Sequence, residues 1–417
     1  MSYENKFIKK CVFELENLTE KDKPYTRLVF SKHFKEARKW LVDQFNILDL
    51  EVRIDDAGNL IGSYKSKNDS RKKILIGSHL DTVPSGGRFD GIAGIVSSLS
   101  ILKNFREKKI DFPFDIELYD YLGEELNDWS ISCVGTRGMT GLLDEEILNR
   151  MDSTGRILKD EINKVGGNSK KLIKKFSLFQ DVIACFELHI EQGISLQNNK
   201  IDIGIVKSIP NISRHRINIK GQAGHSGTTL MNDRKDALLY ASSLIIFINK
   251  LANQLSKKDN RHFVATVGKI NNFPNSATII SDSVELIVDL RVVNLHSREE
   301  FLKNLNAEIT NLNKTNNILI EMIQIAYSPY VEMSKEINKI LEKSAKQNNI
   351  SFIHMDSGAG HDTAHLSRVA PASMIFIPCK DGLSHCPEEY AKVCDIDKGS
   401  KVIQNAILGI AEKIEGH

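Results

Sequence analysis

The sequence predicts an α/β protein with a second, smaller α+β unit, and three observations support this. Apolar runs at 73–78 and 114–122 flank a small-residue helix at 91–102, which is the strand–helix–strand order of an α/β sheet. Residues 211–328 show a β-α-β-β-α-β order, which is typical of a small sheet with two helices on one face. A chain of 417 residues is too long for one ordinary core and indicates two or three domains.

The N-terminal half predicts a helix, a hairpin and buried strands in that order. Residues 31–48 place apolar side chains at steps of three and four behind Ser31, a suitable N-cap, so we expect a helix there. Two short alternating runs around a turn at 55–59 predict a hairpin. The apolar runs at 73–78 and 182–188 each lead directly into a histidine and are typical of buried strands.

The rest of the chain divides into three parts. Residues 150–178 are Lys-rich and polar, which predicts an exposed helix pair or a solvated insertion. Within 211–328 we expect helices at 234–255 and 297–311 and strands at 216–221, 263–270, 284–293 and 318–327. The segment 329–417 returns to a helix, an apolar strand at 372–378 and a final helix.

Composition and charge exclude several classes of protein. Lys and Arg total 56 against 54 Asp and Glu, an excess too small for binding nucleic acid through its phosphates. The sequence contains no run of 18 apolar residues, so we expect no membrane-spanning helix. The first residues lack the apolar core of a signal peptide. The six cysteines form no CxxC pair. We therefore expect a reduced, cytoplasmic protein with neither nucleic-acid nor membrane partners.

Ligand-type side chains follow several of the predicted strands. They are His79, Asp81, Asp90, Glu124, Glu125, His189 and His385. In open α/β sheets, binding sites form in the crevice at the carboxyl ends of the strands. Each residue alone is more typical of a turn, a charged surface or a packed or solvated histidine than of a metal site. Their joint occurrence at strand ends, among glycines, favours a metal site.

Two neighbouring divalent ions need one shared carboxylate and one or two nitrogen or oxygen ligands each. The set that meets this need is a bridging Asp90 with His79, Glu125, His189 and His385. Asp81 could hold the far ring nitrogen of His79, and Glu124 would be free to act as a general base. On the chemistry alone, an unrelated structural explanation stays open.

Several motifs resemble those of one family, in order along nearly the whole chain. They are GSHLDTVPSGGRFDG, GEE, ELHIEQG, GQAGHSGTTLMNDRKDA, PNSATIISDSVELIVDLR and SGAGHD followed by GLSHCPEE. The set resembles the N-carbamoyl-L-amino acid hydrolase, allantoate amidohydrolase and β-ureidopropionase branch of the di-zinc aminoacylase/carboxypeptidase-like hydrolases. ELHIEQG and SGAGHD are typical of this branch rather than of the peptidases.

The resemblance implies a di-metal aminopeptidase-like catalytic domain, residues 1–210 and 329–417, interrupted by a ferredoxin-like lid and dimerisation domain, residues 211–328. It implies a homodimer joined through the lid. It also implies two divalent ions per subunit, zinc first with manganese, cobalt or nickel as alternatives, bound by His79, Asp90, Glu125, His189 and His385. Glu124 would be the base.

The resemblance further assigns residues to the substrate. His225 matches a lid histidine that reaches the active site of the partner subunit and stabilises the oxyanion. Arg291 matches the residue that grips the substrate carboxylate, for which a guanidinium fork is suited. Gln192 matches a residue near the polar end of the substrate, and Gly358 and His361 match pocket positions.

Two departures from the family pattern lie near these substrate positions. Leu126–Trp129 follows Glu125, where the family has Gly-Ser-Arg-Phe. Thr278 stands where the family has a carboxylate-binding Asn beside Arg291, and threonine is shorter and has no amide. The metal ligands are unaffected, whereas the usual substrate preference is open.

We therefore expect a hydrolase of carbon–nitrogen bonds other than peptide bonds, acting on a linear carbamoyl or ureido group of a small carboxylate such as an N-carbamoyl-L-amino acid. One alternative is a hydrolase of the same fold acting on allantoate, an N-acyl amino acid, a dipeptide or an unusual ureido or guanidino metabolite. A second alternative is a binding protein that kept the fold and lost the chemistry. The complete set of ligands and Glu124 disfavour the second alternative.

Overall fold

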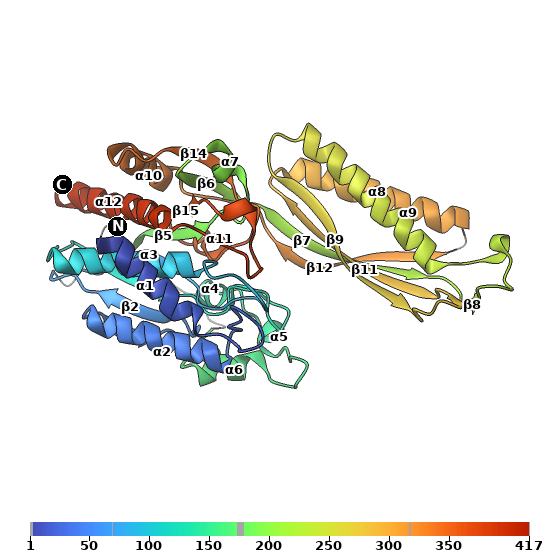
Figure 1. Ribbon diagram of the computed structural model, residues 1–417, viewed down its shortest axis with the longest axis horizontal. Helices are drawn as coiled ribbons and strands as arrows, with labels where there is room; N and C mark the ends of the chain where they lie inside the picture. Colours follow the sequence, from blue (N-terminus) through green and yellow to red (C-terminus); the bar gives the residue numbers. More distant parts are fainter. Residues whose placement is uncertain (1–2, 69, 173–178, 317, 417) are drawn as a thin grey trace. The chain divides into compact units, whose positions relative to one another are not determined.

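The computed structural model describes residues 3–68, 70–172, 179–316 and 318–416. Contacts within the chain define two compact units, which are described separately and are coloured along the chain in Figure 1. Unit 1 comprises Met1–Lys207, Glu332–Met355 and His361–His417, and unit 2 comprises Ser208–Val331 and Asp356–Gly360. Residues 356–360, which the sequence places in the C-terminal catalytic segment, are thus grouped with unit 2.

A nine-stranded sheet forms the centre of unit 1, with the strand order β1-β2-β4-β3-β5-β15-β6-β13 and β14 paired to β6. Its four middle strands are parallel: β4 (Asp115–Asp120), β3 (Lys73–Ser78), β5 (Val182–Ile190) and β15 (Ala372–Ile377). These strands are almost entirely buried, as the apolar runs predict for strands covered on both faces. Because they are parallel, their carboxyl ends share one edge of the sheet.

Antiparallel strands extend this sheet on both sides. The predicted hairpin is confirmed as β1 (Glu51–Ile54) and β2 (Leu60–Tyr64), and β2 pairs with β4. On the other side, β15 pairs with β6. The strands beyond β15 were not expected from the sequence; they are β6 (Ile203–Ile209), β13 (Val331–Glu332) and β14 (Phe352–Asp356).

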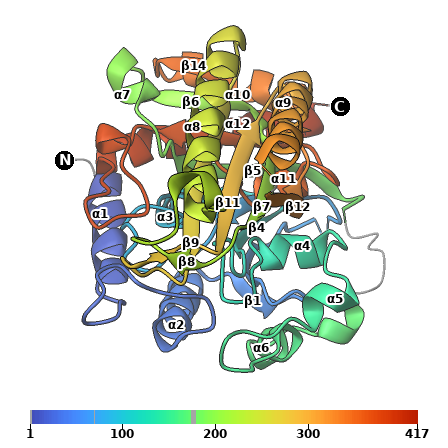
Figure 2. The ribbon, with the colours of Figure 1, turned by 90° about the vertical axis from the view of Figure 1, so that its right-hand side faces the viewer.

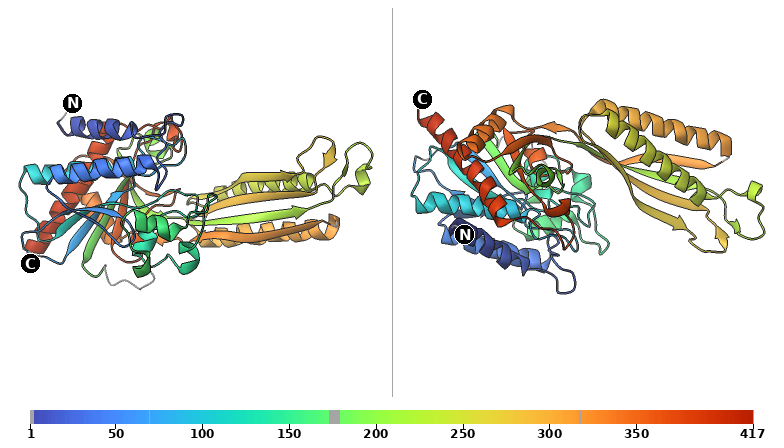
Figure 3. Two further views of the ribbon diagram at one scale, coloured as in Figure 1. Left: turned by 90° about the horizontal axis from the view of Figure 1, so that it is seen from below. Right: turned by 45° about the horizontal axis from the view of Figure 1, so that its top comes forward.

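Long helices cover the large sheet. The helix predicted behind Ser31 is α2 (Lys32–Ile47), and the Ser31 hydroxyl accepts the N–H of Phe34 as an N-cap should. Three further helices pack against one another and are dark blue, cyan and red in Figure 3: α1 (Tyr3–Glu16), α3 (Ile92–Glu107) and α12 (Val393–Glu415). Shorter helices are α4 (Val134–Met139), α5 (Glu145–Leu148), α7 (Ser195–Asn199), α10 (Lys335–Gln347) and α11 (Thr363–Leu366).

The prediction of a solvated insertion at 150–178 is wrong for its apolar side chains. Among its described residues, 150–172, the α-helix α6 (Leu158–Lys164) is followed by a short 3-10 turn at Ser169–Lys171. Leu158, Ile162 and Leu172 are buried in the main core, so scattered apolar residues in a Lys-rich segment anchor it to the sheet. The part of this prediction that falls on 173–178 lies outside the described residues.

Unit 2 has the predicted β-α-β-β-α-β order. Its sheet has the antiparallel order β12-β7-β11-β9, and α8 and α9 lie on the same face of it (Figure 2). The elements are β7 (Asn211–Lys220), α8 (Ala237–Lys258), β9 (Phe263–Phe273), β11 (Ser283–Val292), α9 (Leu295–Asn316) and β12 (Leu319–Ser328). A small separate ribbon pairs β8 (Gly224–His225) with β10 (Ile279–Ile280).

One helix of unit 2 bears on the expectation of no membrane span. By length and composition alone, α8 is apolar enough to cross a membrane, and a third of its most apolar stretch is buried. Its residues Ala241, Leu244 and Ile248 pack on the sheet of unit 2, as those of a core helix in a soluble domain do. The composition of α8 therefore gives little support to a membrane span.

All six cysteines are free thiols.

Candidate metal centre and active site

The shared carboxyl edge of the parallel strands brings the predicted metal ligands together. They arrive from four strands or the loops that follow them: His79 and Asp90 from the connection between β3 and α3, Glu125 after β4, His189 near the end of β5 and His385 after β15. All five belong to unit 1. This is the place where open α/β sheets form their sites.

Asp90 lies at the middle of the cluster. Its Oδ1 is 3.5 Å from Nε2 of His79 and 3.1 Å from Nε2 of His189. Its Oδ2 is 3.2 Å from Nε2 of His385, which is also 3.5 Å from Oε1 of Glu125. The ligand atoms thus form two groups, one with both buried histidines and one with Glu125 and His385, and Asp90 offers an oxygen to each.

The two buried histidines are oriented as metal ligands require. Nδ1 of His79 bonds the carbonyl of Asp81, and Nδ1 of His189 bonds the carbonyl of Ile190, both at 3.0 Å. Their Nε2 atoms therefore face Asp90, and both are buried without a hydrogen bond. Such atoms cost free energy unless something binds them, and imidazole with carboxylate is the donor set of zinc and similar ions. The residues fit a two-metal centre.

Asp81 orients this centre in a way that differs from the expectation. Its carboxylate was expected to hold the far ring nitrogen of His79, but that carboxylate is 3.7 Å away and the backbone carbonyl makes the hydrogen bond. The carboxylate instead accepts the N–H of Glu124 at 3.2 Å and of Glu125 at 3.1 Å. Asp81 therefore fixes a ligand histidine and the Glu-Glu pair together.

Glu124 is a buried carboxyl group that belongs to neither ligand group. Its Oε2 lies 3.9 Å from Nε2 of His79, and its Oε1 lies 3.7 Å from Sγ of Cys133. Burial raises the pKa of Glu124 well above its ordinary value, and the adjacent charge of Glu125 raises it further. A buried carboxyl group with a raised pKa beside the metal positions is suited to take and return a proton.

The remaining acid–base groups of the metal-free centre are linked through Asp90. Burial alone would raise the pKa of Asp90, but the three histidines facing it hold that pKa well below its usual range. The hydrogen bond to Asp90 raises the pKa of His385 to about 9, and burial raises the pKa of Glu125 to about 7. Metal ions must therefore displace protons when they bind.

A buried ion pair supports the loop between His79 and Asp81. Arg38 Nε donates to Asp120 Oδ2 at 2.7 Å, and both side chains are buried. The other oxygen of Asp120 accepts the N–H of Leu80 at 2.9 Å. This pair could not be predicted from the sequence, because its members are 82 residues apart and neither lies in a metal motif.

Two predicted substrate residues of unit 1 lie against the metal ligands. Gln192 Nε2 donates to Oδ2 of Asp90 at 2.8 Å, on the side of the second ligand group. His361 is only 2% exposed, and its ring meets His189 edge to face with centroids 4.5 Å apart. Gln192 is thus placed at the centre itself, whereas His361 lies behind one of its ligands.

The loop Leu126–Trp129, which differs from the family pattern, is anchored by its tryptophan. Trp129 is 2% exposed, packs edge to face on Phe30 and donates from Nε1 to the carbonyl of Arg156 at 2.8 Å. Leu126, directly after Glu125, is half exposed. The loop is therefore a fixed part of the wall next to a metal ligand.

His225 in unit 2 is exposed and carries a defined ring orientation. Its Nδ1 accepts the N–H of Gly227 at 3.0 Å and of Thr228 at 3.2 Å, so the neutral ring holds its proton on Nε2. Thr278 is a neighbour of His225, because its carbonyl accepts the N–H of Ser226 at 3.0 Å beside the β8–β10 ribbon.

Arg291 lies at the opposite end of β11 from Thr278. Its guanidinium donates to Asp289 at 2.8 Å and to the carbonyl of Gly358 at 3.2 Å. Ser283, the first residue of β11, is eight positions before Arg291, so the strand separates them by about 26 Å. Within one copy of the chain, Thr278 is therefore not beside Arg291 as the sequence analysis expected.

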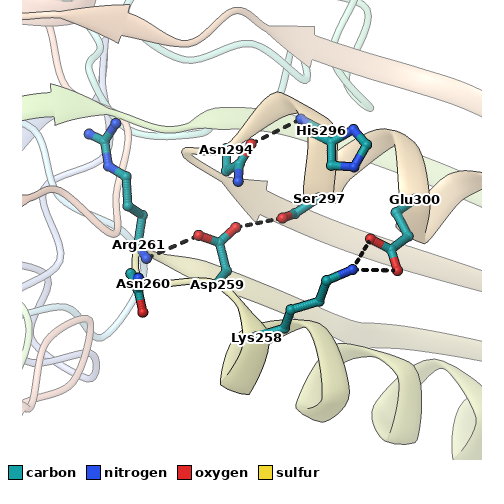
Figure 4. A pocket seen from close by; sticks show the side chains of 8 residues that line it. All are labelled: Lys258, Asp259, Asn260, Arg261, Asn294, His296, Ser297 and Glu300. Atoms are coloured by element: carbon teal, nitrogen blue, oxygen red, sulfur yellow. Dashed lines mark hydrogen bonds and ion pairs between the residues drawn. The ribbon is translucent and has the colours of Figure 1, made fainter.

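A cavity of about 330 Å³ in unit 2 contains none of these residues (Figure 4). It is lined by Lys258, Asp259, Asn260, Arg261, Asn294, His296, Ser297 and Glu300. Lys258 pairs with Glu300 at 2.8 Å, and Asp259 accepts the hydroxyl of Ser297 at 2.6 Å. Two of its charged groups, Lys258 and Glu300, are thus paired with each other, and the cavity is separate from the cluster around Asp90.

A carboxylate shared between two groups of possible metal ligands, with a further buried carboxyl group beside them, is the arrangement of a metal-dependent hydrolase. The chain belongs to the family described as Peptidase family M20/M25/M40, whose profile matches residues 75–409.

Relatives extend this likeness over nearly the whole chain. An N-carbamoyl-L-amino-acid amidohydrolase of a Pseudomonas species is 32% identical and covers 93% of this chain and 94% of its own length. An allantoate amidohydrolase of Bacillus subtilis is 30% identical, covering 93% and 92%. The crystal structure of an amidase of the hydantoinase/carbamoylase family from Burkholderia multivorans has a TM-score of 0.85 at 28% identity and covers 98% of each chain.

Proposed function

We propose that this chain is a metal-dependent amidohydrolase that cleaves the carbamoyl or ureido C–N bond of a small carboxylate, with N-carbamoyl-L-amino acids as the substrate class. The observation that carries the proposal is the cluster around Asp90, with Glu124 buried beside it and bound in neither ligand group. The named activities of the Pseudomonas and Bacillus relatives support the same reaction class.

Two divalent ions would be held by His79, Asp90, Glu125, His189 and His385, with zinc first and manganese, cobalt or nickel as alternatives. When bound, the ions supply Lewis-acid polarisation of the scissile carbonyl and lower the pKa of a water molecule. The second group, with a half-exposed His385, leaves room for water and substrate.

Glu124 acts as the general base and then as the acid. It takes a proton from the attacking water and returns it to the leaving nitrogen, which is a role for a carboxyl group with a raised pKa. Asp81 holds the Glu124 backbone in place for both steps. An N-carbamoyl amino acid would yield the free amino acid, carbon dioxide and ammonia.

The substrate contacts proposed for unit 2 require a second copy of the chain. A proton on Nε2 makes His225 a donor to the developing oxyanion, and Arg291 with Gly358 would hold the substrate carboxylate. β11 separates Arg291 from Ser283 by roughly 26 Å. His225 and Thr278 lie at the β8–β10 ribbon, which precedes Ser283, so a small substrate cannot reach both ends. A homodimer joined through the lid would supply each end from a different subunit.

We also propose a catalytic role for residues 1–210 and 329–417, a lid role for 211–328 and a cytoplasmic location. A second substrate class, allantoate or another ureido acid, is supported by the named activity of the Bacillus subtilis relative. Thr278, which offers one hydroxyl where an amide would offer more contacts, leaves the usual substrate preference open. The substrate test is ammonia release by the metal-loaded protein. The panel holds N-carbamoyl-L- and D-amino acids, 3-ureidopropionate and allantoate, with N-acetyl amino acids and dipeptides assayed for amine release.

Turnover of one ureido acid at least tenfold above the others would support the proposal. Turnover of dipeptides or N-acetyl amino acids alone would replace it with the alternative of the same fold. An inactive protein that also binds no metal would favour the non-catalytic binding homologue.

A further inference from the structure

Glu389 is a fully buried carboxylate that joins two loops of the metal centre without being one of its predicted ligands. Its Oε1 accepts the N–H of Phe89 at 2.8 Å and of Asp90 at 3.0 Å. Its Oε2 accepts the hydroxyl of Ser384 at 2.7 Å. One side chain therefore connects segments that are 299 residues apart in the sequence.

The two connected segments carry the ligands that most need positioning. Asp90 is shared between both ligand groups, and Ser384 directly precedes His385. The Ser384 hydroxyl also lies 3.1 Å from Oδ2 of Asp90, so it stands between the two carboxylates. His79 and His189, by contrast, are fixed by strands of the central sheet.

The backbone of the second segment needs such support. His385 has a φ of +58°, in the left-handed region that costs a non-glycine residue free energy. Its side chain is half exposed, so burial contributes little to holding it. A residue persists in this conformation only when its surroundings determine it. The hydrogen bond from Ser384 to Glu389 is one such determinant.

The loop before Asp90 is shaped around the same carboxylate. A Cβ atom at Gly87 would lie 1.9 Å from Cδ of Glu389 and 2.0 Å from its Oε1. Only glycine lets the backbone approach so closely, so Gly87 and Glu389 form one fitted contact. This contact is independent of the hydrogen bonds, and it likewise ties the carboxylate of Glu389 to the loop before Asp90.

We propose that Glu389 is a positioning residue that sets the distance between the shared carboxylate of Asp90 and the His385 ligand of the second metal site. The inference rests on the proposed two-metal function. Losing Glu389 frees the His385 loop from the Asp90 loop, while the sheet still holds the histidines of the first site. The second ion should therefore be lost selectively, because residues that orient ligands typically contribute about 10- to 100-fold to metal affinity.

The test is a calorimetric titration of the metal-free protein with Mn²⁺, which binds such sites weakly enough for both dissociation constants to be measured. Glu389→Asp shortens the connection by one methylene, and Gly87→Ala displaces Glu389 without changing any charge. Glu389→Gln keeps the reach and two acceptor contacts and serves as the conservative rescue. Glu388→Ala, at the exposed neighbour, is the matched control.

We expect Glu389→Asp and Gly87→Ala to bind the second Mn²⁺ about 10- to 100-fold more weakly and the first within about threefold of the unaltered chain. Glu389→Gln should fall between, and Glu388→Ala should match the unaltered chain. Should both variants fail to fold, Ser384→Ala, which removes only the link to the His385 loop, should weaken the second ion alone.

Second-ion affinities within twofold in the folded variants would overturn the proposal, as would equal weakening of both ions, which is the mark of a general structural role. An unaltered chain that binds fewer than two ions would instead overturn the two-metal function itself.

Discussion

The substitution Glu124→Gln removes the proposed general base while leaving the proposed metal ligands around it intact. Glu124 belongs to neither ligand group, and the amide has nearly the same volume as the carboxyl group. Its neighbours, His79 Nε2 at 3.9 Å and Cys133 Sγ at 3.7 Å, leave room for an NH₂ group. The backbone N–H bond to Asp81 is kept. Glu124→Gln should therefore still bind two metal ions.

The expected loss is confined to turnover. A positioned general acid–base group contributes about 10²- to 10⁴-fold, so kcat should fall by this factor, or about 3 to 5 kcal/mol in the barrier. Stability should not fall, since burial disfavours the charged carboxylate at this position, as its raised pKa indicates. The thermal midpoint of Glu124→Gln should equal or exceed that of the unaltered protein.

Three measurements on one preparation test this reasoning: ammonia release at saturating substrate, metal content and thermal midpoint. Glu125→Gln is the matched control, because it should lose both turnover and the second ion. A Glu124→Gln protein with two ions and a kcat within tenfold of the unaltered enzyme would refute the assignment of Glu124 as base. Loss of an ion would show that Glu124 is a ligand.

Three further outcomes follow from the same geometry. Arg38→Met leaves its carboxylate partner buried and unpaired, so the free energy of unfolding should fall by about 3 to 5 kcal/mol in urea titrations; a change below 1 kcal/mol would contradict this. Metal uptake should release more protons at pH 7 than at pH 10, because in the metal-free protein the pKa is about 9 for His385 and about 7 for Glu125. Calorimetry in buffers of different ionisation enthalpy measures this release, and equal release at both pH values would count against it. Mixed dimers of His225→Ala and Glu124→Gln should regain activity in one of their two sites, and wholly inactive hybrids would argue against catalysis across subunits.

The clustering of the proposed metal ligands could be predicted because the position of each depends on local pattern and topology. Apolar runs that end in His79, Glu125 and His189 predict buried strands, and parallel strands put their carboxyl ends on one edge. The order of unit 2 is likewise set by local periodicity, which β7, α8 and the later elements confirm. The resemblance of the motifs added the roles that pattern alone left open.

The features that were missed depend on contacts between distant segments. Glu389 lies in the motif GLSHCPEE, but only the folded chain brings its carboxylate to the N–H groups of Phe89 and Asp90. The separation of Thr278 from Arg291 follows from the length of β11 and the position of the β8–β10 ribbon, which a motif does not encode. The burial of Leu158 was also missed: Leu158, Ile162 and Val165 stand at helical steps of four and three, but they lie in a Lys-rich segment whose overall polarity indicates an exposed region.

The central claim is that two divalent ions in this centre support hydrolysis of a ureido C–N bond. The most direct measurement is ammonia release from an N-carbamoyl-L-amino acid by the chelator-treated chain as Zn²⁺ or Mn²⁺ is added in equivalents per subunit. We expect almost no ammonia without metal and a rise in turnover that reaches its plateau near two equivalents. Full turnover without metal would contradict the claim, and so would a chain that holds two ions and hydrolyses no ureido acid.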